Sequence, residues 1–142
     1  MNSFIDYLKE SNDYYSGTGA NEDTIRSSQA DLALVFAKEY IDYLKECGIA
    51  SADGHEFTGI TKSKRLNVVD VTLEIRTRYQ VPMELYVIEA LHIDGIFIMQ
   101  NNKGYIYVLY PNGNLEKLAD SAFDYVKNQR FHDLEMDDDK AK

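Results

Sequence analysis

The feature that most constrains the fold is a series of three short runs of β-branched and aromatic residues in the second half of the chain. These runs span residues 85–92, 96–100 and 105–110. Asp94-Gly95 separates the first two runs, and the polar stretch 101–104 separates the last two. Such residues commonly build the tight turns between antiparallel strands. The second half therefore predicts an antiparallel meander.

A helical period precedes the meander. In residues 36–47, apolar side chains recur at three- or four-residue intervals and charged side chains fill the opposite face. The apolar residues are Phe36, Tyr40, Tyr43, Leu44 and Cys47. This spacing is typical of an amphipathic helix. Gly48 is suited to end that helix, because glycine adopts left-handed backbone conformations without steric cost.

Shorter helices are predicted from capping residues. Ser3 and Asn21 each precede a segment with an acidic residue in its first turn, and Asp120 or Ser121 precedes the last apolar segment. Side-chain oxygens of these residue types accept hydrogen bonds from the free N–H groups of a first helical turn. We therefore expect a helix after each of these positions.

The middle of the chain holds one clear element and one ambiguous element. Asp53-Gly54 lies between two short apolar segments and predicts a hairpin of two short strands. In residues 68–79, apolar and polar side chains alternate and β-branched residues are frequent, which favours a strand. Considered alone, this period does not indicate a helix.

Length and composition favour one cytoplasmic domain. The chain has 142 residues, of which 44% are hydrophobic, enough for a single core. We expect a domain over residues 1–132 and an acidic, disordered tail over 133–142. Cys47 has no partner for a disulfide, and the N-terminus lacks a basic and then apolar signal pattern. A reducing cytoplasm fits both observations.

The net charge constrains the partner. Lys and Arg number 15 and Asp and Glu number 24, so the formal charge is -9. Nucleic acid would be repelled by most of such a surface, whereas a basic protein would be attracted to it. We therefore predict no direct binding to nucleic acid and a basic protein partner.

No residue pattern indicates catalysis. None of the histidines, His55, His92 and His132, has a second ligand at the helical spacing that zinc hydrolases use. Cys47 falls on the apolar face of its predicted helix, where core packing is the expected role. We therefore predict no metal, no cofactor and no enzymatic activity.

One predicted strand has two faces able to bury apolar surface. Tyr105 and Tyr107 share one face of the run 105–110, and Ile106 and Val108 share the other. The tyrosine face either lies under further chain or forms a recognition surface. We choose five candidate partner-binding residues, because they combine exposure at a turn or a place on this tyrosine face with anionic or amphipathic side chains. They are Asp53, Glu56, Asp94, Tyr105 and Tyr107.

The run 32–48 resembles the SUKH superfamily, which groups bacterial immunity proteins with yeast cell-wall assembly regulators. The family pattern reads LG-x-x-LP-x-x-Y-x-x-FL-x-x-x-G. This chain keeps Leu32, Tyr40, Leu44 and Gly48. Ala33 and Ala37 replace the family's glycine and proline, and alanine would permit one continuous helix in place of an elbow. Further similar pieces are residues 57–60, Arg76, 85–88 and 119–123.

The resemblance implies an α+β fold. It implies a mostly antiparallel sheet of about five or six strands, with helices packed mainly on one face. It also implies a helix at 68–79, and we follow it there against the alternating period. The implied function is immunity to a bacterial toxin, often a nuclease, and a nuclease must be basic to hold nucleic acid. The alternative is a regulatory scaffold of the yeast type, without enzymatic activity.

Overall fold

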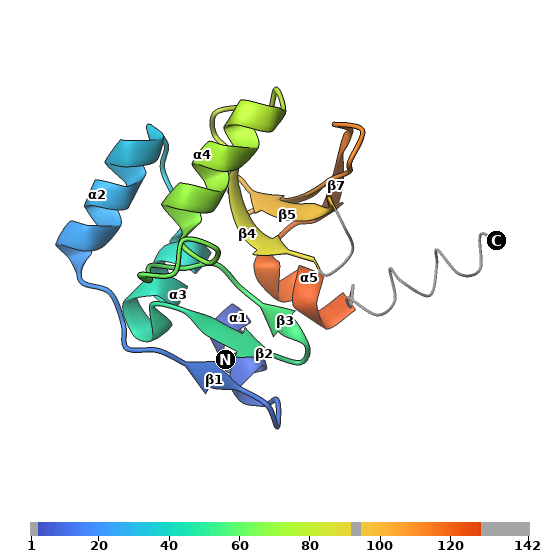
Figure 1. The fold of residues 1–142 in the computed structure, drawn as a ribbon. Coiled ribbons are helices and arrows are strands. Elements are labelled where there is room, and N and C mark those ends of the chain that lie inside the picture. Colours follow the sequence, from blue (N-terminus) through green and yellow to red (C-terminus); the bar gives the residue numbers. More distant parts are fainter. Residues whose placement is uncertain (1–2, 92–94, 129–142) are drawn as a thin grey trace.

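The computed structural model describes residues 3–91 and 95–128 (Figure 1). Helices and strands both occur along the chain. The helices are α1 (Phe4–Lys9), α2 (Glu22–Leu32), α3 (Lys38–Cys47), α4 (Val68–Arg78) and α5 (Ala122–Asn128). The strands are β1 (Tyr15–Ser16), β2 (Ala50–Ala52), β3 (His55–Glu56), β4 (Tyr86–Ala90), β5 (Phe97–Gln100), β6 (Ile106–Leu109) and β7 (Leu115–Ala119).

The strands form two antiparallel sheets. The smaller sheet has the order β1-β2-β3, and the larger sheet is a meander with the order β4-β5-β6-β7. An isolated β-bridge between Phe57 and Glu89 joins the two sheets. The α+β class and the antiparallel meander are thus confirmed. The predicted single sheet is in fact divided, and the short β1 and the polar β7 bring the strands of the described residues to seven.

The larger sheet is covered on both faces. Alternate residues of each strand face opposite sides of the sheet, so the side chains of one face pack in one hydrophobic core and those of the other face in a second core. Tyr86, Ile98 and Ile106 face the main core with α1, α3 and α5, whereas Val87 and Met99 face a smaller core under α4. Figure 1 shows α4 beside β4, away from α5. Most helical packing is on one face, as predicted, and α4 covers part of the other.

The segment 68–79 is helical, as the family resemblance implies. Asn67 caps α4 by accepting hydrogen bonds from the N–H groups of Val69 and Asp70. Burial follows a helical period through Val68, Val71, Thr72 and Ile75. The alternation and the β-branched residues favour a strand in the sequence alone. Here the helix cap and the contact of α4 with the larger sheet outweigh that strand propensity.

Tyrosine supplies much of the buried surface. Four tyrosines, Tyr40, Tyr43, Tyr86 and Tyr125, are at most 2% exposed. Each hydroxyl has a hydrogen-bond partner: Thr58 for Tyr40 and Tyr43, Gln100 for Tyr86, and Glu89 for Tyr125. A buried hydroxyl without a partner would cost the desolvation energy of that group. These bonds therefore allow tyrosine to fill core positions.

The elbow between α2 and α3 forms without the family's glycine and proline. Ala33 ends α2 in a left-handed conformation with φ 56°. Ala37 precedes α3 in an extended conformation, and its N–H donates to the Tyr86 hydroxyl at 2.9 Å. Phe36, which lies between them, is buried. Tertiary contacts at the elbow thus exclude the continuous helix that alanine alone would permit.

Gly59 lies where the segment after β3 crosses the end of α3. A Cβ atom at this position would stand 2.0 Å from the carbonyl oxygen of Gly48. We expect Gly59→Ala to lower the free energy of unfolding by about 3 kcal/mol or more, because backbone atoms would have to move. Gly54→Ala is the matched control, with φ 80° but no atom within 4 Å; its expected cost is about 1 kcal/mol. Urea unfolding that ranks the two variants in the opposite order would contradict this reading.

Candidate functional site

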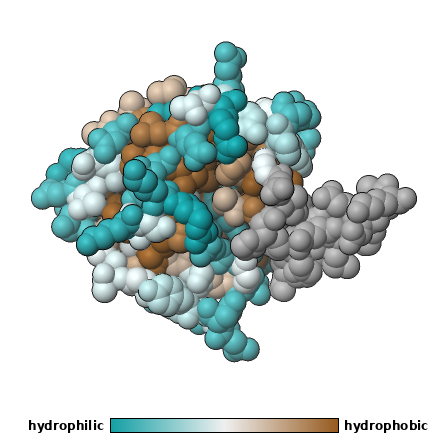
Figure 2. Space-filling model, viewed as in Figure 1, coloured by the Kyte–Doolittle hydropathy of each residue, from teal (hydrophilic) through white to brown (hydrophobic). Residues whose placement is uncertain are grey.

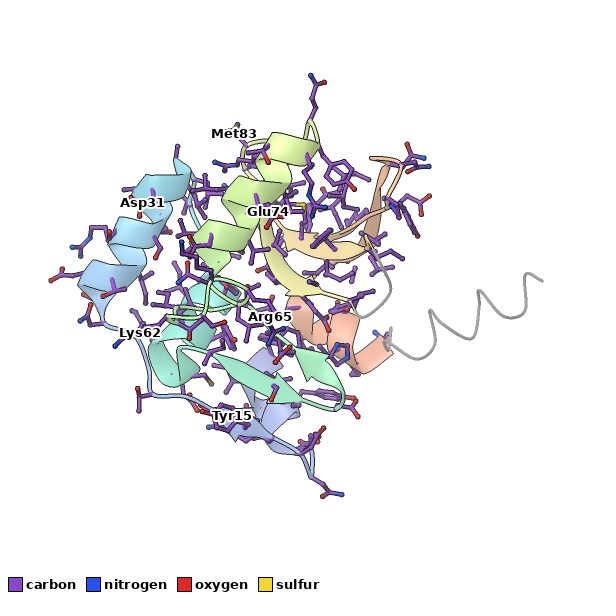
Figure 3. The ribbon with its side chains drawn as sticks, in the orientation of Figure 1. Tyr15, Asp31, Lys62, Arg65, Glu74 and Met83 are labelled. Carbon is purple, nitrogen blue, oxygen red and sulfur yellow. The ribbon has the colours of Figure 1, made fainter. Side chains whose placement is uncertain are left out.

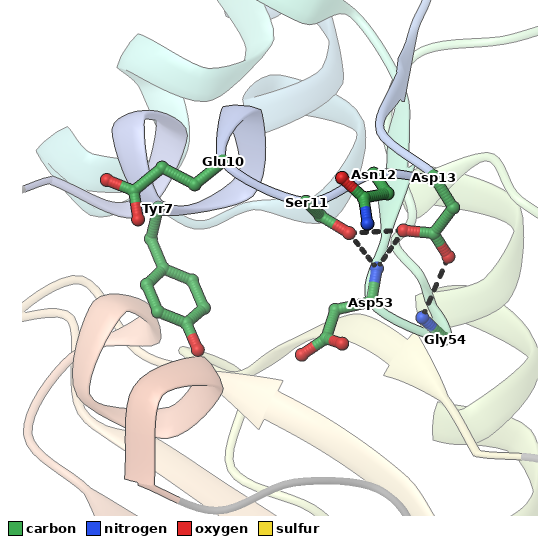
Figure 4. Close-up of a pocket in the computed structure, with 7 residues that line it drawn as sticks. All are labelled: Tyr7, Glu10, Ser11, Asn12, Asp13, Asp53 and Gly54. Atoms are coloured by element: carbon green, nitrogen blue, oxygen red, sulfur yellow. Dashed lines mark hydrogen bonds between the residues drawn. The ribbon is translucent and has the colours of Figure 1, made fainter.

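A concave acidic surface lies between the N-terminal helix and the hairpin turn (Figure 4). Its cavity is about 510 Å³. The lining residues are Tyr7, Glu10, Ser11, Asn12, Asp13, Asp53 and Gly54. In Figure 4 the hydroxyl of Tyr7 and the carboxylate of Asp53 project toward the same open space. We call this surface the acidic pocket.

Asp13 joins the two segments that form the acidic pocket. Its carboxylate accepts hydrogen bonds from the backbone N–H groups of Asp53, at 2.6 Å, and Gly54, at 3.3 Å. It also accepts a hydrogen bond from the Ser11 hydroxyl. The Ser11 hydroxyl and these backbone N–H groups hold the pKa of Asp13 below its ordinary value. Asp13 therefore stays ionised while it fixes the turn.

Two further carboxylates, Glu10 and Asp53, add negative charge to the acidic pocket. Glu10 and Asp53 are exposed, and neither forms an ion pair with a described residue. Asp53 sits in a left-handed conformation with φ 54°, which aspartate tolerates better than most residues. The acidic pocket therefore presents negative charge on a backbone that a hydrogen-bonded turn holds in place.

The acidic pocket continues as a groove along α1. A hollow of about 200 Å³ shares Tyr7 and Glu10 with it, and a third hollow of about 430 Å³ shares Ser3 and Phe123 with the second. Tyr7 and Phe123 form the apolar middle, with ring centroids 6.2 Å apart. We use the name α1 groove for these three hollows together. Aromatic and acidic side chains thus adjoin along it, with Lys127 and Lys38 also in its lining.

The far end of the α1 groove is fixed by Glu39. Its carboxylate accepts hydrogen bonds from the N–H groups of Ala122, at 2.7 Å, and Phe123, at 3.0 Å. Gln100 donates to the same carboxylate at 2.9 Å. Because Glu39 belongs to α3, these bonds hold the start of α5 against α3 and the larger sheet. The groove is therefore bounded by elements that are bonded to one another.

A buried polar cluster lies behind the hairpin turn. Nδ1 of His55 is hydrogen-bonded to the carboxylate of Glu89 at 2.8 Å, and the Tyr125 hydroxyl donates to the same carboxylate at 2.6 Å. His55 and Glu89 are each 2% exposed. Burial lowers the pKa of His55, but the hydrogen bond and charge of Glu89, with smaller effects of Asp53 and Asp13, raise it above 6.5.

This shift predicts a pH-dependent stability. Because the folded-state pKa of His55 is raised, its stabilising contribution is complete below pH 6.5, the unfolded value, and is lost as pH rises through the folded value. We expect the difference in free energy of unfolding between the wild type and His55→Gln to shrink over that range. Urea titrations from about pH 5.5 to 9 measure it. A difference that grows with pH would show that His55 is neutral in the folded protein.

The predicted contact residues that the structure describes do not lie on one surface. Asp53 lines the acidic pocket, but Glu56 ion-pairs with Arg65 at 2.9 Å on another surface. Asp94 lies outside the described residues. Tyr105 is half-buried under the ammonium of Lys117, which is 4.0 Å from the ring centroid. Tyr107 is half-buried against the smaller core. Packing accounts for much of the tyrosine face, so of the two readings left open the structure favours cover by the chain.

Sequence reasoning missed Glu10 and Asp13. Both belong to the polar segment after α1, which resembles an ordinary loop. The available signal was the motif Ser11-Asn12-Asp13, whose side chains commonly bind nearby backbone N–H groups. Here Asp13 binds a turn 40 residues away, which only the fold reveals.

The structure offers no metal site within residues 3–91 and 95–128, since no three His, Cys, Asp or Glu side chains there could hold an ion together. Asp53, His55 and Glu56 are close in sequence but separate in the hairpin, because His55 points into the core and Glu56 faces Arg65. In the same ranges, none of the helices has the length and apolarity to cross a membrane.

Comparisons with known proteins agree with this architecture. Residues 1–131 match the SUKH_5 family, described as SMI1-KNR4 cell-wall. The chain belongs to this family. A search of curated proteins finds no match. A similar fold occurs in a crystal structure of a protein from Pseudomonas syringae pv. tomato, with TM-score 0.72 and 15% identity, covering 91% of this chain and 97% of that chain.

Membership of the SUKH family confirms the resemblance noted from the run 32–48. SUKH domains are generally immunity or regulatory domains without enzymatic activity, and their partners are proteins. The structural likeness at 15% identity shows the shared fold alone. The function of this SUKH protein must therefore be argued from its surfaces.

Proposed function

We propose that this SUKH-family protein is an immunity protein that neutralises a cognate toxin, a basic nuclease domain, by tight stoichiometric binding. The observation that carries the proposal is the acidic pocket, where Glu10, Asp13 and Asp53 adjoin aromatic surface on a bonded framework. A protein partner fits family membership. The whole chain carries a charge of -9, which attracts the same class of partner.

Electrostatics supplies the mechanism. A nuclease holds its phosphate backbone with Lys and Arg, so its active-site cleft attracts a negatively charged surface. Carboxylates that stand in for phosphates would speed association and block the cleft at once. The aromatic rings of Tyr7 and Phe123 add apolar contact area beside the charges. Binding then excludes nucleic acid without any reaction in the immunity protein.

The direct test uses the protein encoded next to this one. The C-terminal domain of a large neighbouring protein would be co-purified with the full chain and titrated by calorimetry. We expect a 1:1 complex with Kd of about 1 nM, and loss of that domain's toxicity when both are expressed together. A regulatory scaffold would instead leave every neighbouring domain unbound and its toxicity unchanged, and that result would contradict the proposal.

A further inference from the structure

A surface of opposite charge lies on the loop of residues 61–67. Lys62, Lys64 and Arg65 are exposed there, in a chain whose net charge is -9. The N–H groups of Leu66 and Asn67 both donate to the Ser63 carbonyl, at 3.0 and 2.9 Å. The loop thus closes on itself, so its cations are displayed from an ordered backbone.

Two of these three cations remain available. The Arg65 guanidinium is bidentate on Glu56, at 2.9 and 3.3 Å, which neutralises that pair. Lys62 and Lys64 make no ion pair with any described residue. Two ammonium groups in one short loop therefore give a local positive potential that the acidic remainder of the chain does not cancel by contact.

An apolar hollow lies beside this loop. Its volume is about 220 Å³, and its lining residues are Tyr15, Ile49, Ala50, Ser51, Glu56, Thr61 and Leu66. Tyr15 is 63% exposed, which is unusual for so large an aromatic side chain. In Figure 3, Tyr15 and Arg65 are drawn on either side of β2, and Lys62 is drawn further from β2, toward α3.

The surroundings of the hollow combine charge and apolar surface. On the face drawn in Figure 2, strongly hydrophilic side chains lie between apolar areas. An exposed tyrosine at the edge of a small apolar hollow is typical of protein-binding surfaces, since it adds contact area with little loss of conformational entropy. We use the name basic surface for Tyr15, Lys62, Lys64 and the hollow.

We infer that the basic surface binds an acidic segment of a partner protein, with one apolar side chain of that segment seated in the hollow. Charge complementarity selects the sign of the partner, because Lys62 and Lys64 lack carboxylate partners among the described residues. A hollow of about 220 Å³ is large enough for one apolar side chain. A long polyanion such as nucleic acid would meet the acidic remainder of the protein, whereas a short peptide segment would not.

This inference does not depend on the toxin role, because it uses a different surface and a partner of opposite charge. Glu10, Asp13 and Asp53 play no part in it. Failure of either proposal therefore leaves the other standing.

The test measures binding of a labelled acidic peptide to the full chain. The probe is a fluorescein-labelled peptide of sequence Glu-Asp-Glu-Leu-Asp-Glu-Asp, and fluorescence anisotropy is recorded at low ionic strength. We expect Kd of about 10 μM. Lys62→Glu with Lys64→Glu should weaken binding at least about 10-fold, because four units of charge change at the contact. Tyr15→Ala, and serine in place of the peptide's leucine, should each weaken it about 3-fold or more.

Matched controls separate a site from general attraction. Lys103→Glu with Lys127→Glu makes the same change in net charge at exposed positions elsewhere and should leave Kd within about 2-fold. Equal weakening in this control would overturn the inference. Undetectable binding of the probe by the wild type would also overturn it. So would wild-type affinities for the serine peptide and for an oligonucleotide of the same length that equal the affinity for the probe.

One further variant tests whether the chain itself occupies the basic surface. The acidic residues of the C-terminal segment are Asp133, Glu135, Asp137, Asp138 and Asp139. If their replacement by asparagine and glutamine tightened probe binding about 10-fold, this segment would be the occupant, and the partner assignment would be overturned. An unchanged Kd supports a separate partner.

Discussion

Glu89→Ala is expected to lower the free energy of unfolding by about 3–5 kcal/mol, the loss that follows when one member of a buried ion pair is removed. The substitution would leave the imidazole of His55 and the hydroxyl of Tyr125 without their common acceptor. Nε2 of His55 has no hydrogen-bond partner among the described residues, so none of them supplies a second bond that would compensate. Glu89 also pairs with Phe57 in the bridge between the two sheets. The hairpin and α5 should therefore loosen together.

Glu89→Gln is the matched control. Glutamine keeps the shape of the side chain and one acceptor oxygen but removes the charge, so we expect a smaller loss of about 1–2 kcal/mol. Chemical denaturation of the wild type and both variants at pH 6 compares them, with hydrogen exchange to locate the loosened elements. A loss under about 1 kcal/mol for Glu89→Ala would mean that the cluster contributes little to stability.

Glu10→Lys combined with Asp53→Asn should slow association with the cognate toxin domain by about 10- to 100-fold at low salt. The pair changes the charge of the acidic pocket by three units. Asparagine is chosen for position 53 because it tolerates the left-handed conformation found there, with φ 54°. Lysine suits position 10 because it follows the C-terminus of α1. The fold should therefore be retained.

Stopped-flow kinetics at several salt concentrations measure this effect. Asp31→Lys combined with Glu116→Gln makes the same three-unit change at exposed positions outside the α1 groove and is expected to reduce the rate less than about 3-fold. The dependence of the rate on salt should also become shallower only in the first variant. Equal rates for the two variants would remove the acidic pocket from the mechanism.

Local patterns predicted the elements with strong physical signals. Ser3 and Asn21 cap α1 and α2 through their side chains, and Ser121, one of two candidates, caps α5. The meander follows the predicted order, with β4, β5 and β6 inside the three apolar runs. These signals are local, because capping and alternation depend on residues only a few positions apart.

Local sequence patterns did not predict the elements that are stabilised by contacts between residues far apart in the sequence. The strand β1 has two residues and exists by pairing Tyr15 with Ser51 and Ser16 with Ala50. The helix α4 carries a strand-like alternation, and only the family resemblance predicted it. The elbow depends on the Tyr86 hydroxyl, which is 49 positions away from Ala37. In each case a tertiary contact outweighs local propensity.

The candidate contact surface divides in the same way. Asp53 was selected as an exposed acid at a turn, and it does line the acidic pocket. Its neighbours there, Glu10 and Asp13, belong to the segment that follows α1, which is distant from the hairpin in the sequence. Glu56 was chosen on the same grounds as Asp53. A two-residue hairpin strand places it beside Arg65, where its charge is paired.

Composition and local pattern were sufficient for the meander, the helix caps and the overall negative charge, because each depends on residue type or on short-range spacing, and the family resemblance added the α+β class. The tertiary structure decided which carboxylates stand together and which are neutralised. Asp13 meets the hairpin turn through backbone N–H groups, and Glu56 meets Arg65, although nothing local distinguishes these acids. Charge is additive along a sequence, but a binding surface depends on distance in space, and only folding sets that distance.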